Sequence, residues 1–178
     1  LLKSTEAPLW LRKRVSHLLT DLACRHLAVI IAVFVPLQGS TASMSQDQLC
    51  SSACQRLGQT LAVSAGSDAK GKKVQERLCH QILILLDGAY PETTKDVISS
   101  QTLAIIQTSW AVLYYLPKSV VKSYVLEPWQ NALTWPQGGG SNSIFLIHRV
   151  IRQIATLFTF LPPMPTFQRN IVLNQILH

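Results

Sequence analysis

The chain has 178 residues, of which 48% are hydrophobic and only 14% are charged, and its formal net charge is +7. Soluble domains carry about 25% charged residues, so this composition holds more apolar surface than a free-standing body of this length normally buries. The cations are too sparse for a nucleic-acid footprint, and we expect no nucleic-acid partner. The composition instead predicts helix faces that are covered by neighbours.

By length the chain is one domain, spanning 1–178. It begins with Leu1-Leu2-Lys3 and ends inside an apolar-periodic segment, 171–178, so we expect both ends to be cuts through a longer protein. Basic residues are concentrated near the start, and no acidic residue follows Glu127.

The first predicted helix opens at Pro8, because proline is tolerated in the first turn. Four residues at helical spacing predict its apolar face: Leu11, Val15, Leu18 and Leu22. The apolar run 27–35 stops at Pro36, and its nine residues are too few for a membrane-spanning helix, which needs about 20. We interpret the run as a buried helix end. The pattern leaves open whether 8–35 forms one helix or two, broken near Thr20.

A loop at 36–45 precedes the next helix, in which Ser45 and Gln48 have the spacing of a capping box. The expected buried stripe of this helix is Leu49, Cys50, Ala53, Cys54, Leu57 and Leu61. A polar loop at 64–71 leads to a helix from about Lys72, with an inward face of Val74, Leu78, Ile82, Leu85 and Leu86. We expect that helix to end at Asp87-Gly88, with the glycine in a left-handed cap.

The second half of the chain begins at Pro91 and continues the pattern. A helix over 94–116 has Leu103, Ile106, Trp110 and Leu113 on one face. Its uncharged run 97–116 holds too many Ser, Thr and Gln residues to insert well into a bilayer. A helix over 119–135 is expected to be interrupted at Pro128, because proline breaks the backbone hydrogen bonding.

A Gly-rich loop at 136–142 separates these segments from the most regular helix of the chain, which Ser143 caps. Its apolar positions are Ile144, Ile147, Val150, Ile151, Ile154, Leu157, Phe158 and Leu161. Pro162-Pro163 ends this helix, and Thr166 begins a last one. No strand alternation or hairpin turn is found.

The cysteines are Cys24, Cys50, Cys54 and Cys79. We expect buried thiols of a reducing compartment. A zinc site would have to combine Cys50, Cys54, Cys79 and His80, but the gap between the first two is wider than the two-residue gap of zinc knuckles. We therefore predict no metal site.

Catalysis needs clustered polar groups with shifted pKa values. The five histidines are scattered along the chain, and the glycines at 138–140 lack the Lys and Ser or Thr of a phosphate-binding loop. We predict no cofactor and no enzymatic activity. A nucleophile at Cys79 beside His80 is the remote alternative.

Two groups of residues are candidates for binding. The aromatic group comprises Trp110, Tyr114, Tyr115, Tyr124 and Trp129, and Trp and Tyr are favoured in protein interfaces. The basic group on the first helix comprises Arg12, Lys13 and Arg14, beside Trp10, and would suit an anionic membrane surface.

The succession of amphipathic helices has a rhythm of roughly 35–50 residues, in the range of helical solenoids. The chain resembles the HEAT and armadillo class of α-helical repeat scaffolds in two successive helix pairs, 45–63 with 72–86 and 94–116 with 119–135. The spacing of Asp21 and Arg25 is similar to the polar ladder of HEAT helices. Repeat lengths are irregular, and no consensus Pro or Asp/Arg position recurs.

The resemblance implies an all-α, solenoid-like stack of antiparallel helix pairs, with about 6–8 helices and a curved face that binds another protein. We therefore expect a non-enzymatic scaffold segment of a large intracellular protein, in complex assembly or trafficking. Its partners would be other subunits or the rest of its own solenoid. The alternative is a membrane-peripheral or membrane-embedded module that contacts anionic lipid through its basic first helix.

Overall fold

The structure, a computed structural model, describes residues 7–35, 46–89, 100–134 and 141–159. Within these ranges it is all-helical and holds no strand, which confirms the all-α part of the expected fold class. The α-helices are α1 (Leu9–Phe34), α2 (Gln46–Ser64), α3 (Ala69–Gly88), α4 (Ser100–Tyr115), α5 (Lys118–Val121), α6 (Glu127–Leu133) and α7 (Ser141–Thr159). A π-helical turn, η1 (Lys122–Leu126), joins α5 to α6.

The first helix, α1, spans 26 residues and consists of two helical segments that meet at a kink at His26, whose φ and ψ are non-helical at −138° and 47°. The alternative of a break near Thr20 is wrong, since Thr20 is helical and its hydroxyl bonds back to the Ser16 carbonyl at 2.9 Å. The run 27–35 is thus the second part of a longer helix. By length and composition α1 could cross a membrane, although the core helix of a soluble protein passes the same test.

The apolar face predicted for α1 is not the face that meets the core. Leu18 and Leu22 are 57% and 53% exposed. The buried residues of α1 are instead Leu19, Thr20, Ala23, Cys24, Leu27, Ile30 and Ile31. This helix has two apolar faces, and periodicity alone does not say which of them the rest of the chain will cover.

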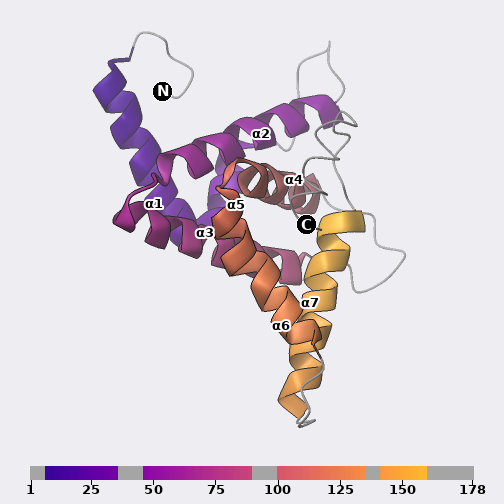
Figure 1. The fold of residues 1–178 in the computed structure, drawn as a ribbon. Coiled ribbons are helices and arrows are strands. Elements are labelled where there is room, and N and C mark those ends of the chain that lie inside the picture. The colour runs from indigo at the N-terminus through magenta and orange to yellow at the C-terminus, as the bar shows by residue number, and fades with distance from the viewer. Residues whose placement is uncertain (1–6, 36–45, 90–99, 135–140, 160–178) are drawn as a thin grey trace.

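The helices pack both with their neighbours in the chain and with elements further along it (Figure 1). The most extensive contact joins α2 to α4, α1 lies against both α2 and α3, and α3 also packs on α7. Among the described residues α2 and α3 make no extensive contact with each other, nor does α4 with α5 or α6. The consecutive pairs expected from the sequence are therefore not the principal packing units, and a solenoid-like stack is not confirmed.

Close approach of α2 and α4 depends on Gly58. A Cβ atom built on Gly58 would lie 2.8 Å from the Val112 amide nitrogen and 2.9 Å from the Ala111 carbonyl carbon. Such separations are below van der Waals contact, so only glycine fits here. Around this contact lie buried apolar side chains from both helices: Cys54, Leu57, Leu61, Ala104, Ile106, Trp110 and Val112.

The helix α3 ends at Gly88 as expected, but its start and the conformation of its last residue differ from the expectation. The helix begins at Ala69, before the predicted start at Lys72, because Asp68 caps it by accepting a hydrogen bond from the Gly71 amide at 2.7 Å. The predicted left-handed cap at Gly88 is wrong, since Gly88 is the last helical residue and Ala89 after it has right-handed backbone angles. Among the described residues a positive φ is found instead at Gly66, at 77°, in the turn before α3. The inward residues Leu78, Ile82 and Leu86 are buried as expected.

Helical structure runs through Pro128 without the expected break. Pro128 lies in the first turn of α6, and Glu127 before it keeps helical angles of −61° and −44°. The irregularity precedes the proline, in the wider π-helical turn η1. A π-helical turn lets a helix continue past a residue that cannot donate the regular hydrogen bond.

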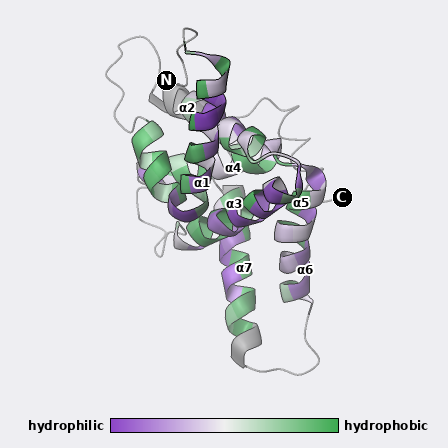
Figure 2. Ribbon diagram, turned by 90° about the vertical axis from the view of Figure 1, so that its left-hand side faces the viewer, coloured by the Kyte–Doolittle hydropathy of each residue, from purple (hydrophilic) through white to green (hydrophobic). Residues whose placement is uncertain are grey.

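The last described helix, α7, contacts the core through its C-terminal half. Val150 and Leu157 are buried, whereas Ile144 and Ile151, predicted on the same apolar face, are exposed. In two views α6 and α7 extend side by side beyond the other helices, and α7 is hydrophobic towards its outer end (Figures 1 and 2). We call α6 and α7 together the arm.

Several expected features lie outside the described residues. They are the loop 36–45, the Ser45 cap, the start of the fourth helix near Pro91, the glycines at 138–140, Pro162-Pro163 and the helix from Thr166.

Candidate interaction surfaces

The aromatic group divides into core and partly exposed members. Trp110 is fully buried and Trp129 is buried, while Tyr114, Tyr115 and Tyr124 are partly exposed against the core. Tyr114 and Tyr115 meet edge to face with ring centroids 4.9 Å apart. Contact between this group and a partner stays a prediction. The three tyrosines are the members of the group with exposed surface that a partner could reach.

Each of the two buried tryptophans ties its helix to α7. The Trp110 indole N–H of α4 donates to the Leu157 carbonyl at 2.7 Å. The Trp129 indole N–H of α6 donates to Gln153 Oε1 at 2.9 Å. A buried indole N–H is costly without a partner, so these bonds fix where α7 lies relative to α4 and α6.

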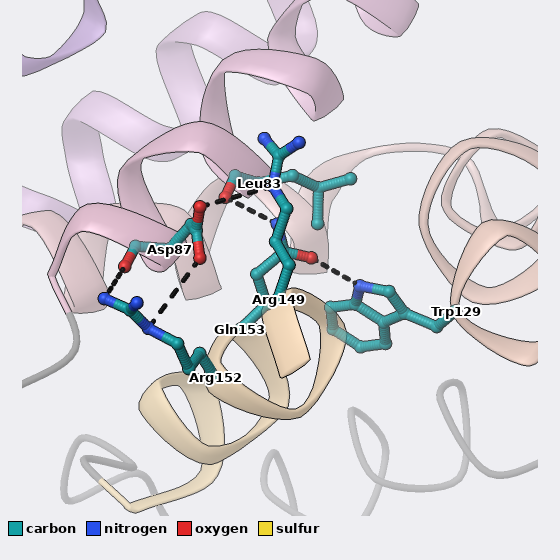
Figure 3. Close-up of polar contacts among 6 residues, drawn as sticks. All are labelled: Leu83, Asp87, Trp129, Arg149, Arg152 and Gln153. Atoms are coloured by element: carbon teal, nitrogen blue, oxygen red, sulfur yellow. Dashed lines mark hydrogen bonds and ion pairs between the residues drawn. The ribbon is translucent and has the colours of Figure 1, made fainter. Parts of the chain in front are cut away.

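Gln153 connects the arm to α3 (Figure 3). Its side-chain amide accepts from Trp129 and donates to the Leu83 carbonyl at 3.0 Å, so one buried residue joins three helices. Beside it, Arg149 Nε lies 3.2 Å from Asp87 Oδ2, and Arg152 donates to the Asp87 backbone carbonyl at 3.3 Å. We call these six residues the anchor network: Leu83, Asp87, Trp129, Arg149, Arg152 and Gln153.

Beyond the anchor network, the arm presents apolar side chains to solvent. Phe145 on α7 is 74% exposed, and Leu133 on α6 is 46% exposed. We call the exposed apolar residues of the arm the arm patch: Leu133, Ile144, Phe145, Leu146 and Ile151. A groove of about 400 Å³ borders this patch, lined by Asp87, Ile144, Phe145, His148, Arg149 and Arg152. Apolar and cationic groups therefore meet at one surface.

A second groove, of about 560 Å³, lies between α1, α3 and the η1–α6 segment. Its lining includes the exposed cations Lys73 and Arg77, with Glu76 between them, and His80 one turn further along α3. The mixture of charges does not favour one class of ligand.

The three described thiols are buried, and two of them, Cys24 and Cys79, are poorly nucleophilic. Burial raises the pKa of the Cys79 thiol to about 12 and, with a smaller contribution from Asp21, that of Cys24 to about 11. Thiolates are the reactive form, so both groups stay protonated and inert at neutral pH. His80 is exposed while Cys79 has no exposed surface, so the two adjacent side chains do not share a site. Among the described residues no three potential ligands converge on a metal position.

The basic group lies at the start of α1, before its first buried residue, Leu19. Lys13 and Arg14 are exposed, whereas Arg12 is partly buried and its Nε atom lacks a hydrogen-bond partner. Trp10, on the same stretch of helix, is 66% exposed. This part of α1 projects from the helices around it (Figure 1).

Sequence reasoning missed the anchor network and the arm patch. Asp87 had been assigned only to a helix end, and Gln153 had no signal beyond its place in an apolar helix. Arg149 and Arg152 lie three residues apart on α7 and so share a face, which is the one local signal for the network.

No protein-family model, no curated protein and no solved structure matches this chain.

Proposed function

We propose that the chain is a non-enzymatic scaffold segment of a large intracellular protein, and that it binds another protein in complex assembly or trafficking. The observation that carries the proposal is the arm patch, in which α6 and α7 expose five large apolar side chains, while Val150 and Leu157 of α7 are buried. Large apolar side chains exposed beside polar residues are typical of protein-interaction sites.

The anchor network supports the proposal because it makes the arm a defined surface. Gln153 holds α7 to α3 and to α6 through two hydrogen bonds, so the outer half of α7 has a fixed direction. A surface that is held in place before binding loses less entropy on association.

The groove beside the patch supports a partner segment that is both apolar and acidic. Phe145 and Ile144 would contact its apolar side chains. Arg149 and Arg152 line the same groove together with Asp87, and the two cations outnumber the carboxylate with which they pair. Arg and aromatic residues contribute most of the energy in protein interfaces. The matching partner is an amphipathic helix with carboxylates along one edge.

The experiment compares the full chain with Phe145→Asp and with Val63→Asp as bait in affinity capture, followed by binding measurements with the purified partner. Val63 is an exposed apolar residue of α2 that lies outside the arm, so Val63→Asp makes the same kind of change in charge and hydrophobicity at another site. We expect Phe145→Asp to weaken binding by at least about tenfold and Val63→Asp to leave it unchanged. A partner that binds all three proteins equally would refute the role of the arm.

A further inference from the structure

The side of α1 that faces away from the core exposes apolar residues on both sides of the kink at His26. Leu18 and Leu22 lie one turn apart before the kink, Val29 and Val33 lie one turn apart after it, and all four are exposed. We call these four residues the outer stripe. The core-facing residues, such as Ala23 and Leu27, lie on the opposite side of the same helix.

We propose that the outer stripe of α1 lies in the surface of an anionic lipid bilayer, with its axis in the membrane plane. The core-facing side of α1 stays packed on α2 and α3, so the helix rests on the membrane without crossing it. This site is separate from the arm patch and does not depend on the proposed function.

The charges beside the outer stripe select an anionic surface. Arg14 and Arg25 are exposed and lie next to the stripe on the helix wheel, and Lys13 is exposed one residue before Arg14. The helix α1 contains one carboxylate, Asp21, and four cations: Arg12, Lys13, Arg14 and Arg25. Long cationic side chains reach from a buried apolar face to the phosphate level of the bilayer.

An exposed tryptophan marks the end of the same surface. Trp10 projects from the part of α1 that precedes the first buried residue. Tryptophan is enriched at the headgroup level of membranes, where its apolar ring and its N–H both find suitable surroundings. Trp10 therefore provides a direct optical probe of insertion.

The alternative occupant, a second copy of this chain, fits the charges less well. Pairing two outer stripes would bring the Arg14 and Arg25 cations of both copies to one seam, with Asp21 as the acidic residue of each α1. Like charges along a helix seam oppose association. A lipid headgroup layer supplies the negative charge that a second copy lacks.

The test is co-sedimentation of the full 178-residue chain with vesicles of phosphatidylcholine alone and of phosphatidylcholine with phosphatidylserine. We expect binding to the anionic vesicles, weakened by added salt. Because each cation near the membrane contributes about fivefold to partitioning, the triple variant Lys13→Gln, Arg14→Gln, Arg25→Gln should bind about a hundredfold more weakly.

Two matched controls separate the site from general charge and hydrophobicity. The variant Lys70→Gln, Lys72→Gln, Lys73→Gln removes the same charge from exposed positions of α3 and should bind as the unmodified chain does. Leu22→Gln should weaken binding by about tenfold or more, because the bound state loses the apolar contact between this side chain and the bilayer. Val63→Gln, exposed on α2, should not.

Trp10 fluorescence completes the test. In a Trp135→Phe background, quenching by brominated lipids should be lost when Trp10→Phe is added, because the two remaining tryptophans, Trp110 and Trp129, are buried in the protein. The proposal is overturned if neither vesicle type sediments the chain, or if the α1 and α3 charge variants bind alike. Concentration-dependent dimerisation that Leu22→Gln abolishes, without vesicle binding, would assign the stripe to a second copy. The proposal is equally overturned if a purified acidic protein binds the outer stripe and vesicles do not compete with that binding.

Discussion

The contact between α2 and α4 and the contact between α7 and its neighbours hold helices together in different ways. At Gly58 the backbones of α2 and α4 approach so closely that no side chain fits between them, and apolar residues surround the contact. Around Gln153 the helices are joined by buried hydrogen bonds, with Asp87 and two arginines at the edge.

The difference teaches how the same apolar periodicity leads to two outcomes. Close packing of α2 and α4 buries a whole face of each helix. Hydrogen bonds at Gln153 and at the Leu157 carbonyl fix the direction of α7, whereas Ile144, Phe145 and Leu146 towards its start stay exposed. Stability in the first region depends on shape, and in the second on satisfied polar groups.

The largest loss in the free energy of unfolding is expected where the two regions meet. Trp110 of α4 is fully buried and donates to the Leu157 carbonyl of α7. Trp110→Ala should lower the free energy of unfolding by about 3–5 kcal/mol, measured by urea denaturation. Trp10→Ala, at an exposed tryptophan, should change it by less than about 0.5 kcal/mol. Equal losses in both variants would contradict the structure.

Gln153→Ala tests the polar region. It leaves the buried Trp129 indole N–H without its partner, which costs about 1–3 kcal/mol, whereas the Leu83 carbonyl keeps the hydrogen bond of its own helix. With Trp129→Phe in the background that orphan is gone, so the loss caused by Gln153→Ala should shrink by about 1 kcal/mol. A double-mutant cycle by chemical denaturation measures this coupling, and strict additivity would argue against the bond.

Gly58→Ala tests the close-packed region. Alanine favours a helix over glycine by about 1 kcal/mol, but the new Cβ has no room between α2 and α4, so we expect a net loss of about 1–3 kcal/mol. Gly88→Ala, where a Cβ meets nothing within 4 Å, should be neutral or slightly stabilising. Thermal unfolding of both variants gives the sign directly, and a stabilised Gly58→Ala protein would mean that the helices do not approach as described.

Asp87→Asn should cause the smallest loss in the free energy of unfolding. Asp87 and its partners Arg149 and Arg152 are partly exposed, so water screens the ion pairs. We expect a loss of no more than about 1 kcal/mol, and a smaller difference at high salt. A loss as large as that of Gln153→Ala would mean that the charges, and not the amide, hold the arm.

Much of the helical pattern could be predicted because apolar spacing and caps are local. The inward residues Leu78, Ile82 and Leu86 of α3 and Ile106 and Trp110 of α4 are buried as predicted. The cap at Asp68 and the continuation through Pro128 were missed, since a neighbouring turn and a π-helical turn changed the local outcome.

The candidate surfaces could be predicted only in part. The basic group at the start of α1 was identified from sequence, and the structure adds that Lys13 and Arg14 are exposed while Arg12 is partly buried. The anchor network was not identified, because its residues come from α3, α6 and α7 and no local spacing brings them together.

The sequence by itself determined that the chain is helical, where most helices lie, and that they carry more apolar surface than one stripe each. Only the tertiary structure decided which of the two apolar faces of α1 is covered, and that α7 is buried for half of its length. The physical reason is that periodicity records the hydrophobicity of a face, whereas burial depends on which other helix reaches it.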